Sequence, residues 1–156
     1  MSVVLSLYPN VRGLGYACAE MPKKLIESGV VTVSPVNNGT VMERVRRFIE
    51  YYKPTIIFVR DPLPTHKRIA KLAAKIEAHA EKEGMPVYRY SRQQITEVFG
   101  TFNAATKYEI SQKIITWFPE LAIRAPKMRK SYMNEDYNMG IFDAIALIVT
   151  HEYLTE

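Results

Sequence analysis

The chain has 156 residues, enough for one domain with its own hydrophobic core. Its 47% hydrophobic and 24% charged residues exclude a disordered chain, and no apolar run reaches the roughly 18 residues of a membrane span. The net charge of +5 favours a polyanionic partner, and a single cysteine, Cys18, excludes an internal disulfide framework. The first residues lack a basic-then-apolar signal pattern, so we expect a cytoplasmic protein with no membrane partner.

The first third of the chain predicts three strands. Val3–Leu7 is an almost unbroken apolar run, typical of a strand buried on both faces, and Tyr8–Asn10 is predicted to end it as a turn. Gly13–Ala19 is then expected to return beside it as a second strand. Val30–Val33 is the third predicted strand.

Helices and strands alternate through the middle of the chain. Thr40 and Glu43 have the spacing of a capping box, which predicts a helix that begins at Thr40. Thr55–Val59 is again apolar throughout, which favours a buried parallel strand. A helix led by Thr65 and a short strand at Val87–Tyr90 complete this region.

Helices dominate the last third. Ser91 and Thr106 each open a capping pattern that predicts a helix, and a final helix is expected from about Asn138 to Leu154. A basic connector over residues 121–135 precedes it. Three antiparallel-type strands followed by parallel crossovers predict an α/β fold, with a mixed five-stranded sheet and helices on both faces. We expect residues 1–156 to form one domain.

Four strings, in this order, resemble the RuvC Holliday-junction resolvase family of the ribonuclease H-like superfamily. They span Leu5–Tyr16, Pro54–Arg60, Val87–Lys107 and Gly140–His151. The resemblance implies a ribonuclease H-like fold, a homodimer, and a centre in which clustered carboxylates hold two Mg²⁺ ions. Such ions activate water and stabilise the leaving oxygen.

Most positions that carry the family's carboxylates hold other residues here. The first-strand aspartate is replaced by Tyr8, the fourth-strand glutamate by Arg60, and the first aspartate of the last helix by Gly140. Asp143 keeps its carboxylate, and Lys107 matches the family's lysine. Magnesium needs hard oxygen ligands, so this set predicts no bound metal or other cofactor. We expect Asp143 to lie in the first turns of a helix, or to pair with Arg60 or Lys107.

Relocated ligands are the alternative. Asp61, Glu135 and Asp136 are acidic residues close in sequence to the family positions. Asp61 qualifies only if the strand has already ended, because a shift of one residue turns a strand side chain to the other face. With such ligands beside Asp143, the chain would be a Mg²⁺- or Mn²⁺-dependent endonuclease.

Basic residues form candidate nucleic-acid contacts. One stripe recurs at helical spacing and contains Arg68, Lys71, Lys75, His79 and Lys82. The other candidates are Arg12, Lys107, Arg124, Lys127, Arg129 and Lys130. They would bind phosphates without reading bases, although an ordinary solvated face has the same pattern. Four aromatic residues are candidates to stack on unpaired bases or to pack in the core: Tyr88, Tyr90, Phe102 and Tyr132.

Three functions follow from the sequence. The first is a catalytically degenerate RuvC-like protein that binds DNA, branched DNA included. The second is an active metal-dependent nuclease with relocated ligands. The third is a structural or interaction protein, such as a homodimer, on the same scaffold. The missing carboxylates favour the first and third functions over the second, and the basic clusters favour the first over the third.

Overall fold

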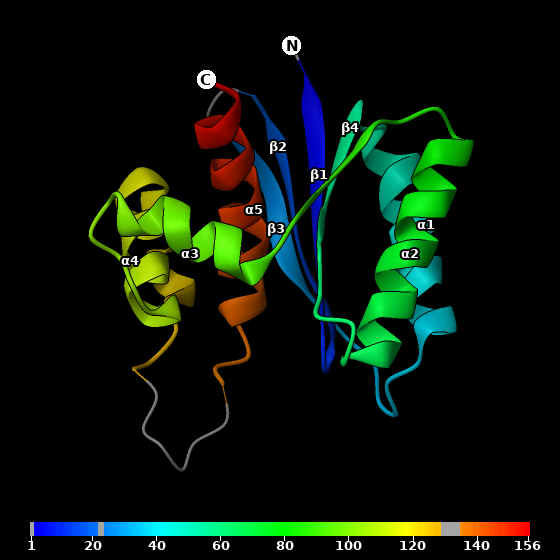
Figure 1. Ribbon diagram of the computed structural model, residues 1–156, viewed down its shortest axis with the longest axis horizontal. Helices are drawn as coiled ribbons and strands as arrows, with labels where there is room; N and C mark the ends of the chain where they lie inside the picture. The colour runs from blue at the N-terminus through cyan, green and yellow to red at the C-terminus, as the bar shows by residue number, and fades with distance from the viewer. Residues whose placement is uncertain (1, 22–23, 129–134) are drawn as a thin grey trace.

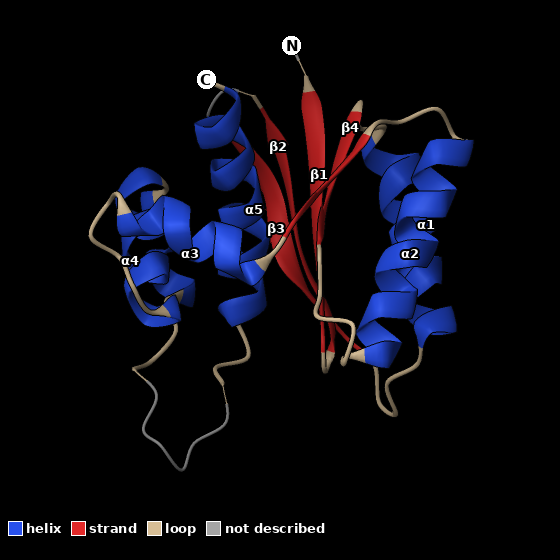
Figure 2. Ribbon diagram, viewed as in Figure 1, coloured by secondary structure: helices blue, strands red, loops and turns tan. Residues whose placement is uncertain are grey.

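A five-stranded sheet separates two layers of helices (Figures 1 and 2). This is a computed structural model, and it describes residues 2–21, 24–128 and 135–156. The strands are β1 (Val3–Asn10), β2 (Gly13–Glu20), β3 (Lys24–Thr32), β4 (Ile56–Arg60) and β5 (Val87–Tyr90). The helices are α1 (Asn38–Tyr52), α2 (Lys67–Lys82), α3 (Arg92–Gly100), α4 (Lys107–Trp117), the 3₁₀ helix η1 (Pro119–Arg124) and α5 (Met139–Thr155).

The sheet is mixed, as the sequence predicts. Its order is β3-β2-β1-β4-β5; the β1–β2 and β2–β3 pairs are antiparallel, and the β1–β4 and β4–β5 pairs are parallel. Parallel neighbours end at the same edge of a sheet. The register, which aligns Leu7 with Val59, therefore brings Tyr8 and Arg60 to one edge.

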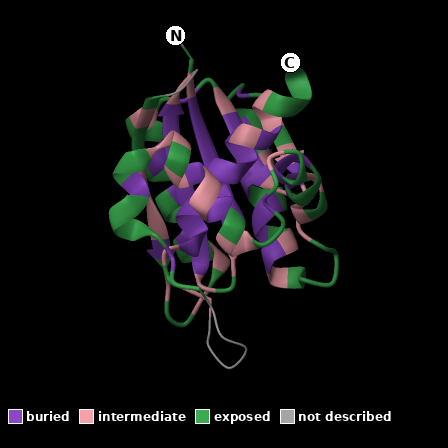
Figure 3. Ribbon diagram, turned by 90° about the vertical axis from the view of Figure 1, so that its left-hand side faces the viewer, coloured by how far each residue is buried: buried purple, intermediate pink, exposed green. Residues whose placement is uncertain are grey.

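The two faces of β1 belong to different cores. Leu5 and Leu7 pack towards α1 and α2, whereas Val4 and Tyr8 pack on the side of α5, α3 and α4. Figure 1 shows these helices on opposite faces of the sheet, and Figure 3 shows buried strands beneath them. Ser6 also faces α5, and its hydroxyl donates to the carbonyl of Ala144 at 2.6 Å. Burial on both faces explains the unbroken apolar run of this strand. Because side chains alternate along a strand, Tyr8 faces α5 together with Val4 and Ser6.

Helix α5 touches the sheet backbone directly where two glycines meet. A Cβ added to Gly15 would lie 2.0 Å from the carbonyl oxygen of Gly140. A Cβ added to Gly140 would lie 3.1 Å from Cγ1 of Val30 and 3.2 Å from Cα of Gly15. Gly140, where the resemblance implies an aspartate, therefore forms a close contact between α5 and β2.

Two predictions at the start of the chain are wrong. The turn predicted at Tyr8–Asn10 is part of β1, with Pro9 opposite Leu14. Proline is tolerated there because the β1–β4 ladder already ends at Leu7. The third strand is longer than predicted and begins at Lys24.

The helix starts are partly as predicted. Helix α1 begins before Thr40, because the Asn37 side chain accepts from the Thr40 amide and acts as the N-cap. The capping box predicted at Thr40 is therefore wrong. Both capping boxes predicted at Ser91 and Thr106 are present. Helix α2 begins at Lys67 rather than at Thr65, and no helix in the described ranges is long and apolar enough to cross a membrane.

Candidate functional site

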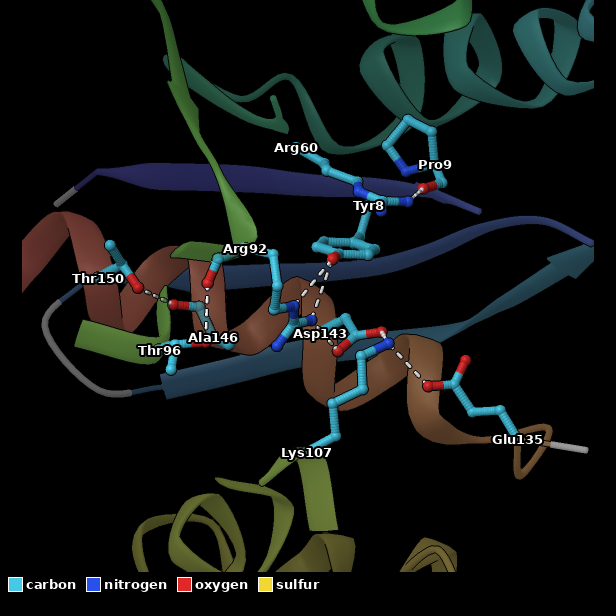
Figure 4. Close-up of polar contacts among 10 residues, drawn as sticks. All are labelled: Tyr8, Pro9, Arg60, Arg92, Thr96, Lys107, Glu135, Asp143, Ala146 and Thr150. Atoms are coloured by element: carbon cyan, nitrogen blue, oxygen red, sulfur yellow. Dashed lines mark hydrogen bonds and ion pairs between the residues drawn. The ribbon is translucent and has the colours of Figure 1, made fainter. Parts of the chain in front are cut away.

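The candidate site is a buried tyrosine surrounded by cations. Tyr8 lies near the end of β1 and is 2% exposed. The guanidinium carbons of Arg60 and Arg92 lie 4.7 Å and 5.3 Å from its ring centroid, and the ammonium of Lys107 lies 6.0 Å from it (Figure 4). Cations at these distances are attracted to the electron-rich face of an aromatic ring. The end of β1 therefore presents positive charge where the resemblance to the RuvC family implies an acid.

Arg92 connects Tyr8 to the carboxylate of Asp143 on α5. It is the first residue of α3, directly after the Ser91 cap. Its Nε and Nη2 donate to the Tyr8 hydroxyl at 3.2 and 3.0 Å, and Nη2 also donates to Oδ1 of Asp143 at 2.5 Å. Burial alone would lower the pKa of Arg92, but the charge of Asp143 and the hydrogen bonds raise it. Arg92 thus stays a permanent cation beside Asp143.

Lys107 takes the second oxygen of the same carboxylate. Its ammonium donates to Oδ2 of Asp143 at 3.3 Å and to Oε1 of Glu135 at 2.7 Å. The capping box at Thr106 begins α4 and so fixes where Lys107 stands. The expected ion pair between Lys107 and Asp143 is present. With only 4% of Asp143 exposed, both of its oxygens are committed to cations.

Of the two cations expected as alternative partners of Asp143, Arg60 is not the one that pairs with it. Its Nη1 donates to the carbonyl of Pro9 at 2.8 Å, and its guanidinium lies against the Tyr8 ring. Arg60 is the last residue of β4, which lies beside the end of β1, and its side chain extends towards that end. Arg92 is the cation that reaches Asp143 instead.

The acidic residues considered as relocated ligands do not assemble a metal centre. Asp61 pairs with Arg89 at 2.9 Å, and Asp136 accepts from the backbone amides of Lys127 and Asn138. Glu135 does reach the site, but it does so through Lys107. Within the described ranges, no three His, Cys, Asp or Glu side chains are placed to hold a metal ion. The residues present do not fit two Mg²⁺ ions, because cations stand where those ions would need ligands.

One residue of the basic stripe on α2 is engaged within the fold, whereas its three lysines are exposed. Lys71 and Lys75 are exposed, as expected for phosphate contacts. Arg68 is half-buried, and it donates to the side chain of Asn38 at 3.1 Å and to the carbonyl of Asn10 at 2.7 Å. Arg68 therefore ties the start of α2 to the β1–β2 turn, and its charge is partly used within the fold.

The remaining basic candidates lie on several elements. Lys127 is exposed, whereas Arg124 donates to the carbonyl of Ser28 at 3.0 Å. Arg12 donates to the carbonyl of Glu135 at 2.8 Å, which places it beside the Lys107–Glu135 pair. Arg129, Lys130 and Tyr132 lie outside the described residues.

The aromatic candidates are largely occupied by packing. Tyr90 is buried, and its hydroxyl lies 2.6 Å from Nδ1 of His151. Tyr88 is more exposed, with its ring centroid 4.6 Å from that of His151. Phe102 packs edge-on against Trp117 at 5.2 Å. Core packing, the alternative to base stacking, therefore describes Tyr90 and Phe102.

The mixed five-stranded sheet between two helix layers is a RuvC-like α/β fold. The chain resembles T. thermophilus RuvC in complex with a Holliday junction substrate, with a TM-score of 0.73 and 21% identity over 99% of this chain and 95% of that chain. A second Thermus thermophilus RuvC structure gives a TM-score of 0.68 and 19% identity, over 98% and 95% of the two chains.

A eukaryotic structure shares the fold. The yeast mitochondrial Holliday junction resolvase Ydc2 gives a TM-score of 0.64 and 13% identity over 96% of this chain and 77% of that chain. No protein-family model and no curated protein sequence matches this chain. These likenesses confirm the RuvC-like fold predicted from the four sequence strings.

Proposed function

We propose that this chain is a nucleic-acid-binding protein that uses the RuvC-like fold without its metal-dependent cleavage. The observation that carries the proposal is the environment of Asp143. Arg92 occupies one of its carboxylate oxygens and Lys107 the other. A carboxylate held in this way is buried and neutralised, so it offers no free ligand to a divalent ion.

Duplex or branched DNA is the partner that the charges support. The net charge is +5, and the exposed Lys71 and Lys75 follow Arg68 at helical spacing on α2. Lysine and arginine contacts to phosphates give affinity without sequence preference. The T. thermophilus RuvC structure contains a Holliday junction, so a four-way DNA junction is the first ligand to test.

Titration of a four-way junction and of a linear duplex at several salt concentrations tests the proposal. If about 4–6 phosphates are neutralised, log affinity should fall with log salt with a slope of about −4 to −5. Replacing both lysines, Lys71→Glu and Lys75→Glu, should weaken binding to every sequence alike. Absence of binding at low salt, or a flat response to salt, would contradict the proposal.

A homodimer is part of the same proposal. A hollow of about 360 Å³ between the ends of α4 and α5 is lined mainly by aromatic and apolar side chains, namely Phe102, Trp117, Phe118, Val149 and Tyr153. Covering such an apolar surface with a second copy of the chain is favourable, because it removes apolar area from water. Sedimentation equilibrium at micromolar concentration tests this, and a single species of 17.9 kDa would contradict it.

A further inference from the structure

Positive charge exceeds negative charge around Tyr8. Arg60, Arg92 and Lys107 surround the ring, whereas the carboxylates paired with them are Asp143 and Glu135. The five groups carry a formal excess of one positive charge. The two carboxylates therefore do not neutralise the cluster.

Two of the cations retain unused hydrogen-bond donors. Nε of Arg60 and Nη1 of Arg92 are buried and have no acceptor among the residues that the structure describes. Arg60 makes its bond through Nη1, to the Pro9 carbonyl, and forms no ion pair within the described ranges. A buried donor without an acceptor costs free energy, so native structures usually supply one, and a bound ion is one source.

The charged groups are not sealed from solvent. The Arg92 side chain is 28% exposed and the Lys107 side chain is 36% exposed. Figure 4 shows Arg92 and Lys107 approaching Asp143 from different elements, while Arg60 reaches the Tyr8 ring from the end of β4. An anion that approaches this edge of the sheet thus meets three cations that α3, α4 and β4 hold in place.

We propose that Arg60, Arg92 and Lys107 form a metal-free binding centre for the phosphate backbone of a nucleic acid. This inference rests on the proposed function and assigns one contact region to it. Guanidinium and ammonium groups bind phosphate oxygens through charge-assisted hydrogen bonds, and arginine keeps its charge at any physiological pH. Divalent ions hold phosphates by the same electrostatic attraction, but these cations are covalently part of the chain. Backbone binding at this centre therefore needs no Mg²⁺.

The test measures how the affinity for a DNA duplex depends on salt, in EDTA and again in Mg²⁺. Compared with wild type, Arg60→Gln and Lys107→Gln should each weaken binding and reduce the magnitude of the salt slope by about 1. The matched control is Lys24→Gln, an exposed lysine at the start of β3. Its partner in the sheet, Glu20, lies opposite Val3, at the other end of β1 from Tyr8. The control should leave the slope unchanged, and wild type should bind as well in EDTA as in Mg²⁺.

The outcomes separate the two proposals. If wild type binds no nucleic acid, the proposed function fails. If wild type binds but the folded Arg60→Gln and Lys107→Gln variants keep its slope, the phosphate centre is wrong and the proposed function stands. Binding that disappears in EDTA would also overturn the metal-free centre. Circular dichroism verifies the fold of each variant, and Lys107→Gln alone decides the matter if Arg60→Gln unfolds.

Discussion

Arg92 at the start of α3 and Asp143 on α5 form an ion pair that is 51 residues apart in sequence and 2.5 Å long between Nη2 and Oδ1. The pair does two things. It compensates the charge of a nearly buried carboxylate. It also places a cation at the point where the resemblance to the RuvC family implies metal ions. The structural and the functional consequences of this pair can be measured separately.

Breaking the pair from one side should destabilise the protein. Arg92→Met leaves Asp143 buried with Lys107 as its remaining cation, and we expect a loss of about 3 kcal/mol in the free energy of unfolding. The double variant Arg92→Met/Asp143→Leu removes both charges and should recover most of that loss. Urea unfolding of wild type, both single variants and the double variant closes the cycle. Simple additivity of the two single effects would show that the pair is not coupled.

The sequence predicted the fold because the fold depends on local signals. The apolar runs of β1 and β4 have the pattern of strands buried on both faces, and the Ser91 and Thr106 boxes mark two helix starts directly. The Thr40 pattern misled because Asn37, three residues earlier, supplies the side chain that caps α1. Two overlapping cap signals cannot be ranked from spacing alone.

The site was predicted only in part. The loss of carboxylates at residues 8, 60 and 140 is visible in the sequence, and so is the lysine at 107. The role of Arg92 was missed because its direction depends on how α3 packs against α5, which no local pattern encodes. One signal was available: Asp143 is an acid within the apolar stretch of the last helix, and a buried acid requires a cation from another element.

The contact between Gly15 and Gly140 gives a second stability prediction. Gly15→Ala would place its methyl group 2.0 Å from the Gly140 carbonyl oxygen, so α5 must move away from β2. We expect a loss of about 3 kcal/mol in the free energy of unfolding. Gly100→Ala is the matched control, since nothing lies within 4 Å of its added Cβ at the end of α3. That control should be neutral or slightly stabilising in the same thermal or urea unfolding experiment.

His151 makes stability depend on pH. Burial among the rings of Phe58, Tyr88 and Tyr90 lowers the pKa of His151, so the folded state favours the neutral imidazole. A lowered folded-state pKa contributes stability that is complete above the unfolded value of about 6.5 and is lost as the pH falls below it. Unfolding at pH 7.5 and 5.5 should show this loss in wild type. His151→Gln should reduce the difference between the two pH values, and an unchanged difference would assign it to other groups.

Catalysis should be absent. Wild type is expected not to cut four-way junctions in Mg²⁺ or Mn²⁺, because Tyr8 and Gly140 supply no carboxylate and Asp143 is held by Arg92 and Lys107. Gel-based cleavage with purified protein checks this. Cutting in Mn²⁺ that Asp143→Asn or Asp136→Asn abolishes would show that ligands have moved, and the non-cleaving proposal would then be wrong.

Rebuilding a metal site should require the removal of Arg92 as well as the return of carboxylates. The triple variant Tyr8→Asp, Arg60→Glu and Gly140→Asp restores the family's acids beside Asp143, but two obstacles remain. The Arg92 guanidinium still bonds Asp143, and a side chain at 140 must displace Val30 or the Gly15 backbone by a few tenths of an ångström.

We therefore expect little Mn²⁺ binding by the triple variant and measurable binding once Arg92→Ala is added, as monitored by electron paramagnetic resonance of free Mn²⁺. The physical reason is that a carboxylate cannot ligate a divalent ion while a permanent cation occupies its oxygen. Arg92→Ala in the wild-type background is the control, because it releases only Oδ1 of Asp143, adds no ligand and should bind no Mn²⁺. Strong Mn²⁺ binding by the triple variant with Arg92 intact would show that the Arg92–Asp143 pair does not block the site.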